Sequence, residues 1–268
     1  MGLYTIKSYL FPESLEEAYE YLSKDPRNNA ILGGCCWLRL GRRRIRTAID
    51  LTRLGLDQIE VKDGWLELGA CATLRQLETS PLVQERFSGI LSRCVSSIVG
   101  VQFRNCATVG GSVYSRFGFS DLTCALLALD ATVVLYHGGE MPLADFVASP
   151  IAFDDILLKV RVKDDGRVAA YETLRRTSTD LPLLAVAASC LDGKWTGAGG
   201  ARPGRAGRAV EAARYLDEGR GAEEAGRVAA EELAFGTDLR AGADYRRKMV
   251  RVLVRRAVQT CITGREQH

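Results

Sequence analysis

Two glycine pairs, each at the end of a short apolar run, constrain this chain more than any other feature. Gly33–Gly34 follows the run AIL, and Gly110–Gly111 follows the run ATV. Because glycine has no Cβ, the backbone can turn sharply there and its N–H groups can approach a ligand closely. The pattern predicts two strands that each end in a glycine loop, with the loops forming two jaws of backbone amides around one diphosphate. A bound dinucleotide fits this expectation.

The common phosphate-binding and nucleophile motifs are missing from the sequence. The stretch GAGGARPG at 197–204 comes nearest to the G-x-G-x-x-G of a Rossmann fold, but Arg202 stands where the last glycine belongs. The chain contains neither a G-x-x-x-x-G-K-[ST] P-loop nor a G-x-S-x-G nucleophile elbow. We therefore expect a diphosphate cradle of a different design.

The composition limits the function classes. The 268 residues are 47% hydrophobic and 26% charged, and the net charge of +3 is too mild for a nucleic-acid-binding surface. No apolar run approaches the roughly 18 residues of a membrane helix, and the N-terminus has no basic-then-apolar signal pattern. We expect a cytoplasmic protein that neither binds nucleic acid nor spans a membrane.

The cysteines and histidines argue against metal chemistry on this chain. The eight cysteines are scattered and form no C-x-x-C pair, whereas iron–sulfur and zinc sites need clustered thiolates. Scattered cysteines are typical of small core residues in a reducing compartment. Only two histidines occur, His137 in an HGGE turn and the terminal His268. We expect no metal ligand and no catalytic histidine.

The elements along the chain predict an α+β protein in three segments. Up to about residue 55, short strands accompany a helix that begins at the capping box Ser14–Glu17. From there to about residue 165, strand patterns surround helices, one of which is the apolar LTCALLAL that Asp121 is placed to cap. The last segment contains strands around the turn Asp192–Gly193 and an amphipathic helix near the end. No regular βαβ alternation runs through the chain.

A basic run, GRRRIR at 41–46, follows the first glycine pair. One interpretation is a solvated loop or edge strand. The other is a contact with a phosphate or an acidic partner.

Taken together, the motifs resemble those of the FAD-binding subunits of molybdenum hydroxylases, such as xanthine dehydrogenase, carbon monoxide dehydrogenase and nicotinate dehydrogenase. In that family the first loop reads roughly AGGTDL, which is similar to Leu32–Trp37. The second loop reads roughly RNVATIGGNIATASPISDL, which is similar to Arg104–Leu122 with the same spacing from Gly-Gly to Ser-Asp. The segments TLRRTSTDLPLLAVAAS and DYRRKMVRVLVRRAV resemble the start and the closing helix of the family's C-terminal domain.

The resemblance implies an α+β fold. Its FAD-binding part is of the PCMH (vanillyl-alcohol-oxidase-like) type, with two α+β subdomains expected at residues 1–55 and 56–165. A C-terminal flavoprotein domain of a small antiparallel sheet and helices is expected at residues 166–268.

The resemblance also implies which residues bind FAD. Main-chain groups of the first loop would hold the pyrophosphate, chiefly at Gly33–Cys36, and the second loop would form the other jaw. Asp121 would bind a ribose-type hydroxyl with help from Ser120, while Ile98 and Leu157 would lie near the flavin or adenine rings. The full expected set is Ala30, Ile31, Leu32, Gly33, Gly34, Cys35, Cys36, Trp37, Ile98, Thr108, Val109, Gly110, Gly111, Ser112, Ser120, Asp121, Leu157 and Glu172. No side chain is expected to act as a catalytic acid or base.

Several positions depart from the family's pattern. The run Cys35–Trp37 replaces a common Thr-Asp-Leu, Ser112 replaces Asn, and Gly118 replaces Pro. Glu172 stands where a lysine beside the flavin is frequent. A carboxylate there would disfavour a negatively charged reduced flavin and shift its potential, which bears on NAD as the electron acceptor.

The function implied by the resemblance is that of an electron-transfer flavoprotein subunit. A purine or another N-heterocycle would be hydroxylated at a molybdenum cofactor on a large partner subunit. Electrons would pass through [2Fe-2S] clusters on a small partner subunit to FAD on this chain, and then to NAD or another acceptor. Two alternatives stay open: a self-sufficient FAD oxidoreductase with its own substrate pocket, and a non-catalytic scaffold subunit with a degenerate flavin site.

Overall fold

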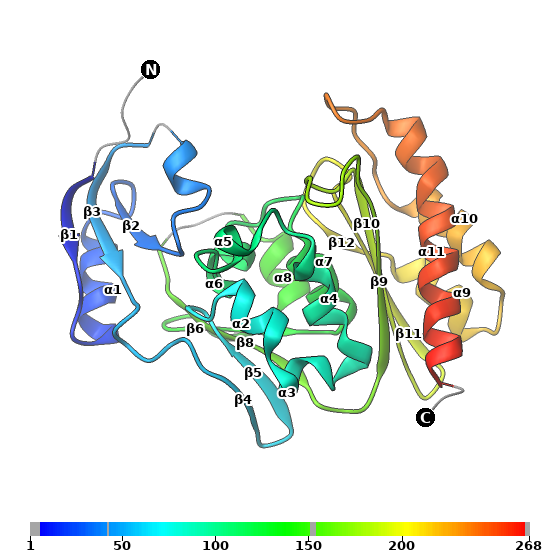
Figure 1. Cartoon of the computed structure of the whole chain (residues 1–268), viewed down its shortest axis with the longest axis horizontal. Coiled ribbons are helices and arrows are strands. Elements are labelled where there is room, and N and C mark those ends of the chain that lie inside the picture. The colour runs from blue at the N-terminus through cyan, green and yellow to red at the C-terminus, as the bar shows by residue number, and fades with distance from the viewer. Residues whose placement is uncertain (1–5, 42, 151–153, 266–268) are drawn as a thin grey trace.

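The computed structural model describes residues 6–41, 43–150 and 154–265. Its elements form three lobes along the long axis of the molecule (Figure 1), each built around its own sheet. The sheets comprise residues 6–50, 59–163 and 168–208 in chain order. The predicted α+β class is confirmed. The domain limits at residues 55 and 165 fall between the sheets, and the division into domains stays a prediction.

The N-terminal lobe is a parallel sheet covered by one helix. Its strands, in spatial order, are β1 (Ile6–Leu10), β3 (Ile45–Asp50) and β2 (Asn29–Leu32). Helix α1 (Leu15–Lys24) packs its Ala18 and Leu22 in one cluster with Ile49 of β3. A single-turn helix, η1 (Leu38–Leu40), follows β2. Because parallel strands end at the same edge of a sheet, β2 delivers the first glycine pair to that edge.

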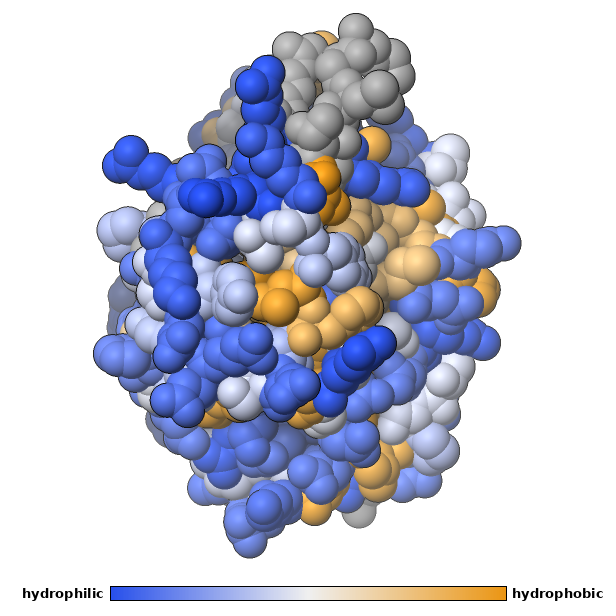
Figure 2. All heavy atoms as spheres, turned by 90° about the vertical axis from the view of Figure 1, so that its left-hand side faces the viewer, coloured by the Kyte–Doolittle hydropathy of each residue, from blue (hydrophilic) through white to orange (hydrophobic). Residues whose placement is uncertain are grey.

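The basic run of this lobe is used within the chain. Arg43 donates to three backbone carbonyls of the segment 26–29, and Arg46 forms an ion pair with Asp25 at 3.7 Å. Arg42 lies outside the described residues. Figure 2 shows this end of the molecule, where extended hydrophilic side chains surround a group of apolar ones. Arg43 also lines the cavity between the lobes, so both interpretations of the run stay open.

The middle lobe pairs an antiparallel sheet with a layer of short helices. In spatial order its strands are β4 (Ile59–Lys62), β5 (Trp65–Gly69), β8 (Leu157–Lys163), β6 (Thr132–Leu135) and β7 (Gly139–Pro142). Its helices are α2 (Leu74–Thr79), α3 (Pro81–Gln84), η2 (Phe87–Gly89), α4 (Ile90–Ser96), α5 (Val101–Arg104), α6 (Val109–Tyr114), α7 (Asp121–Ala128) and α8 (Leu143–Ala148). Alternate apolar residues, such as Leu66 and Leu68 of β5, enter one core with these helices.

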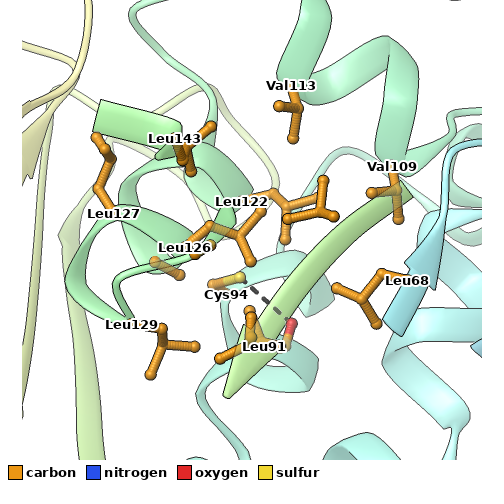
Figure 3. Close-up of a cluster of buried hydrophobic side chains, with 14 of the residues drawn as sticks. Leu68, Leu91, Cys94, Val109, Val113, Leu122, Leu126, Leu127, Leu129 and Leu143 are labelled. Carbon is orange, nitrogen blue, oxygen red and sulfur yellow. Dashed lines mark hydrogen bonds between the residues drawn. The ribbon is translucent and has the colours of Figure 1, made fainter. Parts of the chain in front are cut away.

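Helix α7 forms the centre of the middle lobe, and its sequence is apolar on all sides. Every residue from Asp121 to Ala128 is buried. Figure 3 shows Leu122 and Leu126 of this helix packed among Leu91 of α4, Val113 of α6 and their neighbours. Burying one such side chain stabilises the fold by about 1.5–3 kcal/mol. This packing fixes the position of the first helical residue, Asp121.

The C-terminal lobe is an antiparallel sheet with helices on both faces. In spatial order its strands are β12 (Gly207–Arg208), β11 (Lys194–Gly200), β10 (Leu184–Leu191) and β9 (Val168–Leu174). The helices α9 (Val210–Asp217), α10 (Ala222–Glu232) and α11 (Ala243–Arg265) cover one face, and α4 and α7 pack on the other (Figure 1). Successive residues of β9 therefore enter different cores: Tyr171 joins that of the middle lobe and Ala170 that of the C-terminal lobe.

The strand expected at Ala107–Val109 does not form. Thr108 makes only an isolated bridge with Thr73. Its side chain caps α6 by accepting a hydrogen bond from the N–H of Gly111. The second glycine pair therefore lies in the first turn of a helix instead of in a loop after a strand.

Candidate functional site

A cavity of about 450 Å³ lies where the three lobes meet. Most of its lining residues belong to the first two lobes, and Leu181 comes from the third. The expected site residues that line it are Ala30, Ile31, Leu32, Gly33, Cys35, Cys36, Trp37, Ile98, Thr108, Gly110, Gly111, Ser112, Ser120, Asp121 and Leu157. Gly34, Val109 and Glu172 are not among its lining residues. The structure thus brings segments far apart in the sequence to one place.

The two glycine pairs touch each other at the wall of this cavity. A Cβ on Gly33 would lie 2.9 Å from the Cα of Gly111, and one on Gly111 would lie 2.7 Å from the carbonyl oxygen of Gly33. Gly34 has a φ of +77°, and a Cβ there would lie 1.7 Å from the carbonyl oxygen of Cys106. Only glycine permits this close approach of the two backbones.

The loop after β2 offers unpaired backbone donors. Among the described residues, none accepts a hydrogen bond from the backbone N–H of any residue from Gly33 to Trp37. Gly34 and Cys35 both have a left-handed φ, of 77° and 59°. Successive N–H groups in such turns form a concave site for an anion. The loop is therefore suited to a diphosphate.

The corresponding N–H groups of α6 are used inside the protein. In the run Val109–Ser112, the first two donate to backbone carbonyls of the segment 70–72 at 2.9 and 2.8 Å. The last two donate to the hydroxyl and the carbonyl oxygen of Thr108, both at 3.0 Å. These four N–H groups therefore already have partners within the chain, and the role of Thr108–Ser112 as a second jaw stays a prediction. This glycine pair lets α6 lie directly against the first loop.

Hydroxyl groups surround the cavity between α6 and α7. Ser112 donates to the carbonyl of Thr108 at 2.8 Å, and Ser120 donates to the carbonyl of Ser112 at 3.1 Å. Ser120 also accepts from the N–H of Thr123 at 3.2 Å, so the cap of α7 is Ser120 and not Asp121 as expected. The hydroxyl of Thr123 also donates to Ser120 at 2.9 Å, so both acceptor sites of Ser120 are used within the protein. The Ser112 oxygen keeps acceptor capacity for a ligand.

Asp121 is 3% exposed although it lines the cavity. Its Oδ1 accepts hydrogen bonds from the hydroxyl of Tyr171 and from the guanidinium of Arg175. Burial raises the pKa of Asp121 to about 6, while Arg175 and Tyr171 act in the opposite direction. No described side chain donates to its Oδ2. The second carboxylate oxygen can therefore serve a ligand hydroxyl.

Arg104 holds the segment beside the first loop, a role that sequence reasoning missed. Its buried guanidinium makes two hydrogen bonds to the carboxylate of Glu78, at 2.8 and 3.2 Å, and one to the carbonyl of Ile98 at 3.0 Å. These bonds fix the segment that carries Ile98 to the cavity. The only signal in the sequence that could have indicated this role is the Arg-Asn pair that precedes the second glycine pair.

An aromatic cluster around Trp37 was also not evident from the sequence. The ring of Trp37 lies 6.1 Å from that of Phe103, 6.0 Å from that of Phe117 and 5.0 Å from that of Phe119, measured between centroids. All four rings line the cavity. Trp37, which stands where leucine was the expected residue, thus forms one side of an aromatic wall.

Three thiols at the cavity are held in the neutral form. Burial is the largest cause that raises the pKa of Cys35, Cys36 and Cys71, in the last case to about 11. In the described part of the chain, no group of three or more His, Cys, Asp or Glu residues is placed to hold a metal ion. The helices of the same part include none with the length and apolarity to cross a bilayer.

Glu172 lies apart from the other expected site residues. In the sheet it opposes Val186 of β10, whose side chain belongs to the C-terminal core. Burial raises the pKa of Glu172, with Arg256 and Arg93 acting in the opposite direction. The structure does not bring this carboxylate to the cavity.

Residues 4–162 match a family described as the FAD binding domain in molybdopterin dehydrogenase. The chain is 29% identical to the uncharacterized protein YgfM of Escherichia coli (strain K12), over 98% of this chain and 99% of YgfM. It is 27% identical to the nicotine 6-hydroxylase medium subunit of Paenarthrobacter nicotinovorans, with 93% and 95% covered. A chain of carbon monoxide dehydrogenase from Hydrogenophaga pseudoflava shares the fold, with a TM-score of 0.87 at 24% identity over 98% and 99% of the two chains.

The residues at the cavity fit this cofactor. FAD carries an anionic diphosphate, and the free N–H groups of Gly33–Trp37 are donors without partners in the described chain. The cavity walls beside them are apolar enough for ring systems and include hydroxyl and carboxylate acceptors. The chain belongs to the family of FAD binding domains in molybdopterin dehydrogenases, and its cofactor is FAD.

Proposed function

We propose that this chain is the electron-transfer subunit that carries FAD in a multi-subunit molybdenum hydroxylase. The observation that carries the proposal is the run of unpaired backbone N–H groups at Gly33–Trp37, beside a cavity that all three lobes line. A donor run of this kind binds a diphosphate through the backbone. The replacement of Thr-Asp-Leu by Cys-Cys-Trp therefore leaves its donors in place.

Each part of the cavity has a task in this proposal. The N–H groups of Gly33–Cys36 hold the pyrophosphate. Asp121 accepts from a ribose-type hydroxyl, and the hydroxyl oxygen of Ser112 accepts from another polar group. Ile98 and Leu157 give apolar surface to a ring of the cofactor. Bound FAD supplies the exchange of electrons, and the chain supplies its position and electrostatic surroundings.

We assign the oxidation of the substrate to a partner subunit. The thiols at the cavity are neutral, and Asp121 is engaged by Tyr171 and Arg175. In the proposal, a large subunit with a molybdenum cofactor oxidises the substrate, and a small subunit with [2Fe-2S] clusters passes electrons to this chain. NAD or another acceptor then takes them. Eight free cysteines fit a reducing cytoplasm.

The proposed substrate class is based on the names of two relatives. One is the nicotine 6-hydroxylase medium subunit, and another is the nicotinate dehydrogenase FAD-subunit of Eubacterium barkeri. Both names refer to pyridine compounds. They favour an N-heterocyclic substrate, a class that includes the purines.

Two measurements test the proposal. The purified full-length chain, incubated with FAD and desalted, should retain a visible flavin spectrum, and a spectrum without flavin bands would favour a scaffold subunit with a degenerate site. When the chain is isolated from its native cells, two further subunits should co-purify with it, together with molybdenum and iron. A chain that isolates alone with FAD and oxidises a substrate would favour a self-sufficient oxidoreductase.

A further inference from the structure

Asp121 lies at the junction of the cavity and the C-terminal sheet, and its two carboxylate oxygens differ in their hydrogen-bond partners. Oδ1 accepts from both Tyr171 and Arg175, whereas no described side chain donates to Oδ2. Asp121 is 3% exposed and Tyr171 is 7% exposed. The bonds to Oδ1 are therefore shielded from water, while the residue itself lines the cavity.

The two donors are themselves held in place. Tyr171 belongs to the core of the middle lobe. Arg175, directly after β9, also donates to the carbonyl of Asp180, in the connection that brings Leu181 to the cavity. Arg240 donates to the carboxylate of Asp180 at 3.2 Å and to the carbonyl of Leu181 at 3.1 Å. One hydrogen-bond network thus runs from the cavity to the turn before α11.

We infer that Tyr171 and Arg175 are positioning residues for FAD, which fix Oδ1 of Asp121 and leave Oδ2 for a cofactor hydroxyl. The inference rests on the proposed function, in which Asp121 accepts from FAD. An acceptor that is already oriented loses little freedom when the ligand binds. Because both donors come from the C-terminal lobe, the affinity for FAD depends on the docking of that lobe against α7. Neither donor needs to touch the cofactor.

The protonation of Asp121 gives a readout that is separate from folding. The titratable and charged groups that face it are Tyr171 and Arg175 from the β9 side, Cys94 from α4 and Cys124 from α7. Burial raises the pKa of the tyrosine and of both thiols, which are therefore neutral at pH 7. The pKa of Asp121 is about 6, so the affinity for FAD should fall as the pH drops through this value. Removing the Tyr171 hydroxyl should move that midpoint to higher pH, because it removes a bond to the ionised form.

A double-mutant cycle on the full-length chain tests the inference, with Kd for FAD taken from flavin fluorescence. Tyr171→Phe and Asp121→Asn should each raise Kd about tenfold. The double variant should be no weaker than Asp121→Asn alone, because Tyr171 acts through Asp121. Tyr215→Phe, which changes a tyrosine of α9 that is not among the lining residues of the cavity, should leave Kd unchanged.

Effects that add in the cycle, or an unmoved pH midpoint in Tyr171→Phe, would overturn the inference while wild-type binding stays intact. A wild-type chain that does not bind FAD would instead contradict the proposed function. Should Tyr171→Phe fail to fold, Arg175→Lys serves in the same cycle with the same expected result. Lysine keeps the positive charge but loses the planar fork that reaches both Asp121 and Asp180.

Discussion

The two glycine pairs are alike in the sequence and differ in what their backbones do. After β2, the N–H groups of Gly33–Trp37 have no partner among the described residues, whereas every N–H of Val109–Ser112 is bonded within the protein. The first pair leaves donors available for a ligand. The second supplies space, because Gly111 lies against the carbonyl of Gly33. A glycine pair beside a cofactor can therefore mark either a donor or a close approach of two backbones.

The largest effect is expected from Gly34→Ala. The new Cβ would lie 1.7 Å from the carbonyl oxygen of Cys106, at a φ of +77°. Strain and clash together should cost about 4 kcal/mol of unfolding free energy and weaken FAD binding at least about a hundredfold. Urea denaturation and FAD titration measure the two quantities. Gly64→Ala has the same φ with open space around its Cβ, and it should cost only about 1–2 kcal/mol. Equal costs at the two sites would contradict the packing argument.

Gly111→Ala tests the second pair as a spacer. Its Cβ would lie 2.7 Å from the carbonyl oxygen of Gly33, so the donor loop must shift. We expect a loss of about 2–3 kcal/mol in stability and about tenfold weaker FAD binding. Gly264→Ala, in α11 with nothing within 4 Å of its Cβ, should instead gain up to about 1 kcal/mol. Unchanged FAD binding in Gly111→Ala would show that the donor loop does not depend on this contact.

The spacing of the motifs predicts which residues meet at the cavity, but not how each is used there. Gly33–Trp37 and Ser112–Asp121 are short segments, and the local geometry of each follows from its own sequence. The acceptors for the N–H groups of α6 come from the segment 70–72, and such a long-range pairing leaves no mark in the local pattern. The face on which Glu172 lies depends on the register that sets it opposite Val186, and a shift of one residue would reverse it.

Arg104→Lys tests the support of the segment that ends at Cys106, against which Gly34 packs. Lysine cannot reproduce the two bonds to Glu78 together with the bond to Ile98. We expect a loss of about 2 kcal/mol in thermal or urea unfolding, because bonds to charged groups contribute about 1.5–3 kcal/mol. Arg75 pairs with the same Glu78 from a more exposed position. Arg75→Lys should therefore cost less than about 0.5 kcal/mol, and a similar loss in both variants would refute the special role of Arg104.

Thr108→Ala sharpens the comparison further, since it removes the hydroxyl that accepts from Gly111. The loss of this cap should cost about 1 kcal/mol, much like Ser14→Ala at the start of α1. FAD affinity should change less than about threefold, because the other α6 amides keep their bonds within the protein. A much larger loss of affinity in Thr108→Ala, with Ser14→Ala normal, would mean that the second loop binds the diphosphate after all.

The smallest effect is expected from Glu172→Gln. This substitution changes an expected site residue that belongs to neither glycine loop. Its carboxylate is on the side of the sheet with Val186 and away from the cavity lining, so FAD affinity and the flavin reduction potential should stay at wild-type values. Burial raises the pKa of Glu172, which means that the folded state binds its proton more tightly than the unfolded state. Stability from this group is therefore present at low pH and lost as the pH rises. Glu172→Gln should then raise the free energy of unfolding slightly at pH 7 but not at pH 4. A shifted flavin reduction potential in this variant would instead place the carboxylate near the flavin.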